Sequence, residues 1–246
     1  MTTAPQPRPL LNNECAPVTF RFGFIETSFS SLCGAFEEWF KTVDAKFPNL
    51  RSEFTRITAP LITALLSMEP LTNPSDRYLL VETESNWTAV FANGLRVNDV
   101  ATPTGYLPTV LNCRGLEVGY TPDLSKSKRR DSIRMWGSTL FTLYGPAQTD
   151  WLNRIRHLHV SNDVGGWTFD EGGQLQPFEE AETYKKRRIQ DRFTFEMVER
   201  YCKALGIELN QDDFYGSKSC SVRTTGQKQR GDLAMSIAEA RSHLDL

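Results

Sequence analysis

The hydrophobic positions near the start of the chain change from a strand period to a helix period. Three phenylalanines alternate with other residues in VTFRFGFI (residues 18–25), which is the period of a strand with one buried face. From residue 29 to residue 47, apolar side chains recur at steps of three and four, after Ser28 and before Pro48. Serine is a preferred helix N-cap and proline ends a helix, so we predict a strand followed by a helix over 29–47.

The middle of the chain predicts a sheet. A short apolar run over 60–68 indicates a helix, and residues 77–145 then contain several strand-like segments. RYLLVET and NWTAVFANG read as two strands with a tight turn between them, and the Asn93-Gly94 pair is typical of type I′ hairpin turns. A helix near 106–111 is expected before two more strands, CRGLEVGYT and IRMWGSTLFTLYG.

Residues 154–180 predict a hairpin. The segment 155–160 is strand-like, Gly165-Gly166 permits a reversal, and WTFDE returns as the partner strand. A second reversal is expected at Gly172-Gly173. After it, glutamates precede lysines and arginines over 179–188, an order that suits a helix dipole and predicts a helix there. A further helix is expected from a cap at Thr194.

These elements predict an α+β fold. Strands are grouped in the middle, and helices lie mostly towards the two ends, so we expect a central, mostly antiparallel sheet with helices from the N- and C-terminal parts packed against it. We expect residues 1–16 to be a flexible lead-in and residues 17–246 to form a single domain, with a possible subdivision near 70–76. The last thirty residues offer one strand and one weak helix.

Composition narrows the range of functions. Lys and Arg total 28 and Asp and Glu total 30, for a net charge of −2, so the chain has no overall field that would attract nucleic acid or an acidic membrane. The five cysteines are scattered without a C-x-x-C pair, which favours reduced thiols in the cytoplasm over a disulfide framework. The N-terminus lacks the apolar run of a secretory signal, and no apolar stretch is long enough to span a bilayer. A chain of this size needs no cofactor to fold, and we predict none.

Candidate catalytic chemistry is sparse. The sequence has no G-x-S-x-G, P-loop, G-x-G-x-x-G or H-E-x-x-H motif. His157 and His159 would share one face of a strand, and Asp163 could join them in a metal or catalytic site. Two histidines fall short of a usual ligand set, so hydrogen-bonded or exposed histidines remain the simpler interpretation, and we predict no catalytic residue.

Two basic runs, 126–130 and 185–188, are expected to be solvated surface. Nucleic-acid binding would need aromatic stacking or a recognition helix beside the phosphate contacts. The first run contains no aromatic residue, and the second follows three glutamates. Neither run therefore predicts a nucleic-acid interface.

An acidic stretch is the most informative feature. Six carboxylates lie between residues 162 and 182 with no lysine or arginine among them. A helix N-terminus would offset part of their repulsion. The alternative is a docking face for a basic protein partner, with an aromatic anchor. This candidate face comprises Asp163, Trp167, Asp170, Glu171, Glu179, Glu180 and Glu182.

A resemblance extends over about residues 77–216. It rests on the stretches SNWTAVFANGLRVND, YLPTVLNCRGLEV, LFTLYGP, GGWTFDEGGQLQPFEEAETYKKRRIQDRFTFEMVERYCKALGI and DDFYG. They look like a group of uncharacterised bacterial proteins, and the chain's composition and size are similar to those of toxin-immunity proteins. This resemblance implies a bacterial, cytoplasmic, non-enzymatic protein. Our leading hypothesis is an immunity or antitoxin-like inhibitor that occludes a basic toxin domain through the acidic face. The alternative is an enzyme or metal-binding protein of unknown reaction centred on His157, His159 and Asp163.

Overall fold

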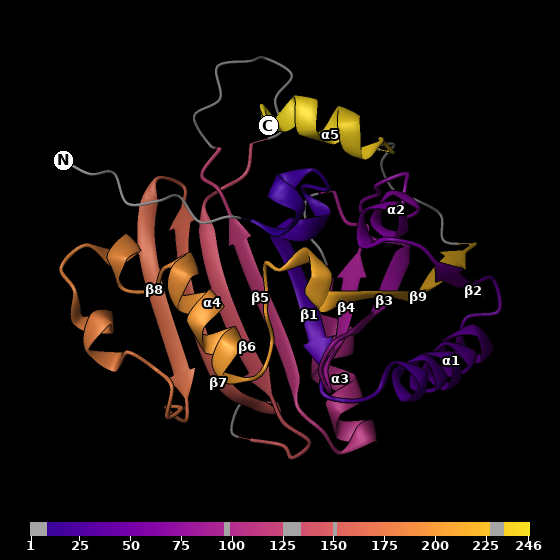
Figure 1. Ribbon diagram of the computed structural model, residues 1–246, viewed down its shortest axis with the longest axis horizontal. Coiled ribbons are helices and arrows are strands. Elements are labelled where there is room, and N and C mark those ends of the chain that lie inside the picture. The colour runs from indigo at the N-terminus through magenta and orange to yellow at the C-terminus, as the bar shows by residue number, and fades with distance from the viewer. Residues whose placement is uncertain (1–8, 96–98, 125–133, 150–151, 227–233) are drawn as a thin grey trace.

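The computed structural model describes residues 9–95, 99–124, 134–149, 152–226 and 234–246. Nine strands within these residues form one antiparallel sheet in the order β2-β9-β3-β4-β1-β5-β6-β7-β8 (Figure 1). The strands are β1 (Arg21–Ile25), β2 (Arg51–Thr58), β3 (Arg77–Thr83), β4 (Thr88–Ala92), β5 (Gly115–Thr121), β6 (Ser138–Tyr144), β7 (Arg154–Asp163), β8 (Gly166–Gly173) and β9 (Tyr215–Thr225). The predicted α+β fold with a central antiparallel sheet is confirmed.

Helices cover both faces of this sheet. The α-helices are α1 (Phe29–Lys46), α2 (Leu61–Leu66), α3 (Ala101–Leu111), α4 (Phe195–Ala204) and α5 (Ile237–Leu244). Short 3₁₀ helices are η1 (Leu10–Asn13), η2 (Val18–Phe20), η3 (Ala181–Lys185), η4 (Ile189–Asp191) and η5 (Asp212–Phe214). None of the helices in the described ranges has both the length and the hydrophobicity needed to cross a lipid bilayer.

The alternation of side chains along the strands creates two apolar layers. One layer, which we name the α4 face, contains Phe22, Val118, Phe141 and Leu158 and lies under α2, α4, α5 and the N-terminal 3₁₀ helices. Figure 1 shows α4 in front of the strands on this side. The opposite α1 face contains Leu80, Val90, Cys220 and Val222 and lies under α1 and α3.

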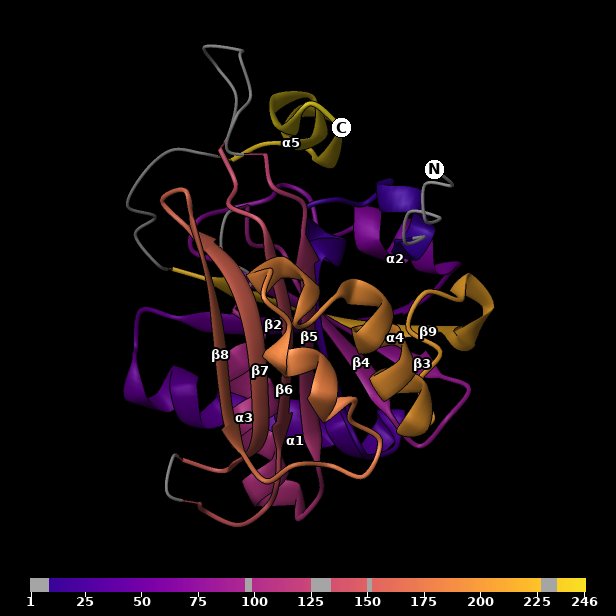
Figure 2. The same cartoon turned by 90° about the vertical axis from the view of Figure 1, so that its left-hand side faces the viewer.

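The α1 face changes character towards β8. Helix α3 packs on β1, β5 and β6, and no α-helix of the described residues makes an extensive contact with β7 or β8 on this side. Figure 2 views the molecule from the end of the sheet that β7 and β8 form. In this view α4 lies to one side of these strands. The side chains that β5 to β8 present on the α1 face are largely polar: Glu117, Thr142, His157, His159 and Asp170. This part of the α1 face is therefore polar, in contrast to the apolar layer under α1.

Several predicted elements are confirmed because they depend on local patterns. Ser28 caps α1 by accepting a hydrogen bond from the Ser31 amide, and β3 pairs with β4 as a hairpin. The strands β7 and β8 also pair, with Asp163 opposite Gly166, so that residues 164–165 form a two-residue turn. The run over 60–68 contains α2, and the helix expected near 106–111 extends further towards the N-terminus as α3.

Other predictions fail where tertiary contacts decide the conformation. Residues 9–16 are not a flexible lead-in, because Leu10, Cys15 and Ala16 are buried in the core, while residues 1–8 lie outside the described part. No continuous helix spans 179–188, which instead contains η3 and the start of an extended segment. Strand β2 was not predicted, and it forms one edge of the sheet.

The Asn93-Gly94 pair is not a hairpin turn. Asn93 is fully buried, and its side-chain oxygen Oδ1 accepts hydrogen bonds from the backbone amides of Asp76 and Arg77, both at 3.0 Å. Its amide group donates to the carbonyl of Pro70 at 3.0 Å. The side chain thus replaces the backbone partners that the 70–77 loop would otherwise lack.

Candidate ligand-binding site

His157 and His159 lie on the same face of β7, as predicted, and their ring centroids are 6.0 Å apart. The nearby carboxylate is Asp170 rather than Asp163. Asp170 lies opposite His159 in the β7–β8 register, and its Oδ2 is 3.7 Å from Nε2 of His157. Asp163 lies at the far end of the hairpin, opposite Gly166. The described residues hold no group of three His, Cys, Asp or Glu side chains with metal-binding geometry, so the alternative of a metal site formed by His157, His159 and Asp163 is wrong.

His157 is held in a fixed orientation. Its Nδ1 lies 2.8 Å from the Thr142 hydroxyl, which is on the neighbouring strand directly opposite. Burial, followed by the positive charge of Arg154 and the nearby His159 ring, lowers the pKa of His157 to about 4. Asp170 acts in the opposite direction. The imidazole is therefore neutral at pH 7, with one nitrogen engaged by Thr142.

The set Thr142, His157 and Asp170 has the residue types of a catalytic triad but not its accessibility. Thr142 is buried in the middle of β6, where a substrate would have to displace the surrounding side chains to reach its hydroxyl. A general base is most effective when its pKa is near the working pH, and the pKa of His157, at about 4, lies far below neutrality. The arrangement orients an imidazole and does not activate a nucleophile.

Arg154 reaches the face of His157 because β7 contains a bulge. Residues 154 and 157 would lie on opposite faces of a regular strand. The β6–β7 register shifts between Leu143 and Tyr144, so that Tyr144 pairs with Arg154 while Thr142 pairs with His157. The extra residue in β7 turns Arg154 to the α1 face, a common effect of bulges.

A chain of polar side chains runs from Arg154 across four strands. The Tyr144 hydroxyl bonds to Arg154 and donates to Glu117 at 3.2 Å, and Glu117 in turn accepts a hydrogen bond of 2.6 Å from Nε of Arg21. Glu117 is almost completely buried, and the two partners offset the cost of burying its charge. Burial, followed by the charge of Glu117, raises the pKa of Tyr144 well above its ordinary value, so the phenol stays protonated and keeps donating.

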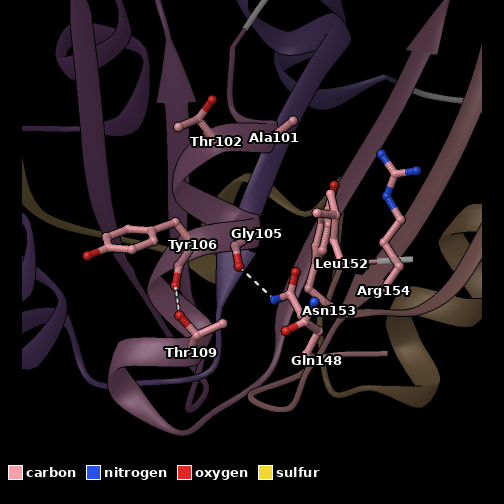
Figure 3. Close-up of a pocket in the computed structure, with 10 residues that line it drawn as sticks. Ala101, Thr102, Gly105, Tyr106, Thr109, Gln148, Leu152, Asn153 and Arg154 are labelled. Carbon is pink, nitrogen blue, oxygen red and sulfur yellow. Dashed lines mark hydrogen bonds between the residues drawn. The ribbon is translucent and has the colours of Figure 1, made fainter. Parts of the chain in front are cut away.

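Two cavities lie on either side of Arg154. The larger, of about 540 Å³, lies between α3 and the β6–β7 connection and includes Tyr106, Tyr144, Leu152 and Arg154 in its lining. The smaller, of about 410 Å³, lies beside His157 and the Gly172-Gly173 end of β8 and is also lined by Arg154. Figure 3 shows Arg154 and Leu152 across the larger cavity from the α3 residues.

Asn153 fixes the wall of the larger cavity. Its side-chain amide nitrogen donates to the carbonyl of Gly105 in α3 at 2.7 Å (Figure 3). The same nitrogen donates to the carbonyl of Gly145 at 2.9 Å. The side chain is buried, so these two bonds tie the β6–β7 connection to the helix. Asn153 thereby helps to set the distance between the two walls.

The acidic residues do not form a single face without counter-charges. Asp170 points to the α1 face, while Glu171 and Glu179 meet on the α4 face at Arg156, whose Nη2 lies 2.7 Å and 2.8 Å from their carboxylates. Glu180 pairs with Arg200 at 2.6 Å, and Glu182 pairs with Lys185 at 2.8 Å.

Within the candidate docking face, Glu179 is assigned wrongly. Its side chain is completely buried and cannot contact a partner. Trp167 is half-buried and packs against the core. Asp163 is exposed at the end of β7.

Of the two basic runs, only 185–188 lies within the residues that the structure describes. The run 126–130 lies outside the described residues. In the run 185–188, Lys185 pairs with Glu182, and Arg188 lies 3.5 Å from Asp191. The side chains that carry the candidate site, apart from the two histidines, are ones that the sequence interpretation did not select: Arg21, Glu117, Thr142, Tyr144 and Arg154.

Comparison of the chain with protein-family models, with curated protein sequences and with solved structures finds no match. Any inference about function therefore rests on the geometry of the site.

Proposed function

We propose that the protein binds a small anionic ligand, bearing a carboxylate or phosphate group, on the α1 face of β6 to β8. The observation that carries this proposal is that Arg154 borders both cavities and lies beside a neutral, oriented His157. Both cavities have volumes within the range of about 300 to 1,000 Å³ that is usual for small-molecule sites.

The donors around the smaller cavity suit an oxyanion. A guanidinium presents several N–H groups in a plane and binds carboxylate or phosphate oxygens in a bidentate manner. Asp170 faces Nε2 of His157, which favours the tautomer with its proton on that nitrogen and leaves Nδ1 to accept from Thr142. An anion bound at Arg154 would replace Asp170 as the acceptor of the single Nε2 proton of His157.

The larger cavity supports an aromatic or apolar body on the ligand. Tyr106, Tyr144 and Leu152 contribute apolar surface to it, and Arg154 is the charged residue in its lining. A ligand with an anionic head beside Arg154 and a ring beside Tyr106 would use both cavities. Binding rather than catalysis is proposed because His157 is a weak base at neutral pH and Thr142 is buried.

The test is a titration with simple probes. Phenyl phosphate and benzoate are expected to bind in the millimolar range or better by calorimetry, and benzyl alcohol, which has the same ring without the charge, at least tenfold more weakly. Arg154→Met should abolish the difference between charged and uncharged probes. Arg200→Met, which removes an exposed guanidinium from α4, is the matched control and should bind as the wild type does. If the Arg154→Met protein bound phenyl phosphate and benzoate as tightly as the wild type does, the proposal would be refuted.

A second proposal follows from the resemblance to toxin-immunity proteins. We propose that the protein acts in the bacterial cytoplasm and occludes a basic toxin domain through the end of the β7–β8 hairpin. The observation that favours it is Val164, which is 81% exposed at that turn and adjoins the exposed Asp163. An exposed apolar residue beside a carboxylate suits a partner that is both apolar and basic.

The partner to test is the product of the reading frame adjacent to the gene for this chain. Asp163→Lys combined with Val164→Ser should slow its association at least tenfold if this hairpin end is the interface. Glu182→Lys, at a glutamate that is 87% exposed but lies outside the hairpin, is the control. Absence of binding by the wild-type protein, or unchanged association of the double variant, would contradict this second proposal.

A further inference from the structure

Two of the five free cysteines lie against each other beneath α1. Cys33 is on the inward side of α1, and Cys220 is on β9; both are fully buried in the same apolar layer of the α1 face. Each thiol is close enough to the other to shift its pKa. They are 187 positions apart in sequence, so only the packing of the helix on the sheet brings them together.

An arginine connects this pair to the surface. Arg56 on β2 is the cross-strand neighbour of Cys220, and its guanidinium also bonds to the Cys33 thiol. The same guanidinium lies 3.1 Å from the Glu37 carboxylate and 5.7 Å from the centre of the Phe29 ring, with 54% of the side chain exposed. A long, positively charged and partly exposed side chain thus lies beside the buried pair.

The surroundings distinguish the two sulfurs. The hydrogen bond from Cys220, followed by the charge of Arg56, lowers the pKa of Cys33 despite its burial. The same contact, together with burial, raises the pKa of Cys220 far above its ordinary value. The thiolate is the reactive form of cysteine and cationic neighbours stabilise it. Cys33 is consequently the nucleophile of the pair and Cys220 is its proton donor.

We propose that Cys33 and Cys220 form a modification site that a hydroperoxide converts to a disulfide between α1 and β9. In the first step, the Cys33 thiolate attacks the peroxide, the O–O bond breaks, and Cys33 becomes a sulfenic acid while hydroxide leaves. In the second step, the Cys220 sulfur attacks the Cys33 sulfur, the S–O bond breaks, and the hydroxide leaves with the Cys220 proton as water. Overall, two thiols and hydrogen peroxide give one disulfide and two water molecules.

This inference is independent of the ligand site, because the two regions of the α1 face are separated by α3 and the strands beneath it. Disulfide formation requires the sulfurs to approach to about 2 Å. Both sulfurs already lie in the same buried layer, so the bond requires α1 to shift on the sheet. The product would fasten the one long helix on this side to a central strand.

The experiment treats the full-length protein with hydrogen peroxide at pH 7 and follows it by intact mass and non-reducing peptide mapping. A loss of two mass units and a cross-linked pair of peptides containing Cys33 and Cys220 are expected. Cys113 is the internal control: it is more exposed than Cys33, but burial raises its pKa to about 11. Exposure alone predicts that Cys113 reacts first, whereas the proposed site predicts that Cys33 does.

Three variants separate the steps. Cys220→Ser should leave Cys33 as a sulfenic acid that dimedone captures, and Cys33→Ser should leave Cys220 unoxidised. Arg56→Met should slow disulfide formation at least threefold without altering the fold, as judged by circular dichroism. Oxidation of Cys113 before Cys33, or wild-type protein that shows no cross-link under conditions that oxidise its unfolded form, would overturn the proposal even if the cysteine variants fail to fold.

Discussion

The guanidinium of Arg156 and the carboxylate of Glu179 form a bidentate ion pair inside the protein, with Nε and Nη2 each 2.8 Å from a carboxylate oxygen. Both side chains are buried. Glu179 also accepts hydrogen bonds from the Tyr184 hydroxyl at 2.7 Å and the Gln176 amide at 2.8 Å. This single carboxylate therefore joins β7 to the 176–184 segment that follows β8.

Neutralising that carboxylate should destabilise the fold. Glu179→Gln leaves the half-exposed Glu171 as the remaining charged partner of the buried Arg156 among the described residues, and breaking a buried pair costs about 3 to 5 kcal/mol. A loss of about 3 kcal/mol in the free energy of unfolding is expected from urea denaturation. Glu182→Gln removes an exposed pair and should change stability by less than about 1 kcal/mol. Equal effects of the two substitutions would show that burial does not set the importance of these carboxylates.

Acid should weaken the fold through His157. Its folded-state pKa of about 4 lies below its ordinary value of 6.5, so between these two pH values the unfolded chain binds a proton that the folded protein does not. The associated stability is complete above pH 6.5, declines as the pH falls towards 4, and changes no further below it. The shift corresponds to about 2 kcal/mol after allowance for partial solvent screening.

The measurement is the free energy of unfolding of the wild type and of His157→Asn across pH 4 to 7. Carboxylates titrate in both proteins, so the difference between the two curves isolates the histidine. The wild type should lose stability more steeply than the variant between pH 6.5 and 4. Parallel curves would mean that the imidazole is not protected from protonation.

The turn between β7 and β8 should be open to stabilisation. Val164 and Gly165 have φ values of 48° and 91°, the positive values of a type I′ turn, which asparagine and glycine favour and a β-branched residue does not. Val164→Asn is expected to raise the free energy of unfolding by about 1 kcal/mol. Gly165→Ala, at the second positive φ, should lower it and is the matched control. A destabilised Val164→Asn protein would indicate that Val164 makes native contacts that outweigh its backbone strain.

The parts of the fold that sequence could predict are those that local periodicity determines. The α1 helix follows from the spacing of its apolar residues and its Ser28 cap. The β7–β8 hairpin follows from the glycine turn between two short strand-like segments. Strand β2 was missed because it is an edge strand whose outward positions carry Arg51, Glu53 and Arg56, and charged edges conceal the apolar alternation. The helix predicted over 179–188 does not form, because the Glu179 carboxylate is bound by Arg156, 23 residues earlier in the chain.

The sequence allowed only part of the candidate site to be predicted. The spacing of His157 and His159 places them on one face of a strand, and that part of the prediction needed no tertiary information. Their partners depend on register: Thr142 and Tyr144 belong to the neighbouring strand, and Arg154 joins them only through the bulge in β7. The alternation of hydroxyl-bearing side chains in STLFTLY was the available signal, but it does not reveal which strand lies opposite.

Asn153 gives the sharpest test of how the larger cavity is held open. Asn153→Ala would leave the carbonyls of Gly105 and Gly145 without this donor, and each unsatisfied buried group costs about 1 to 3 kcal/mol. We expect a loss of about 2 kcal/mol in the free energy of unfolding, because water entering the loosened wall would satisfy part of the lost bonding.

The same substitution should weaken phenyl phosphate binding at least fivefold and leave the binding of inorganic phosphate nearly unchanged, because the ring uses the larger cavity and the anion uses Arg154. Gln148→Ala is the control, since this exposed residue lines the same cavity and should affect stability by less than about 0.5 kcal/mol. Equal weakening for the two probes would place both of them at Arg154 alone. Unchanged binding of both, together with lost stability, would mean that the ring does not enter the space between α3 and the β6–β7 connection.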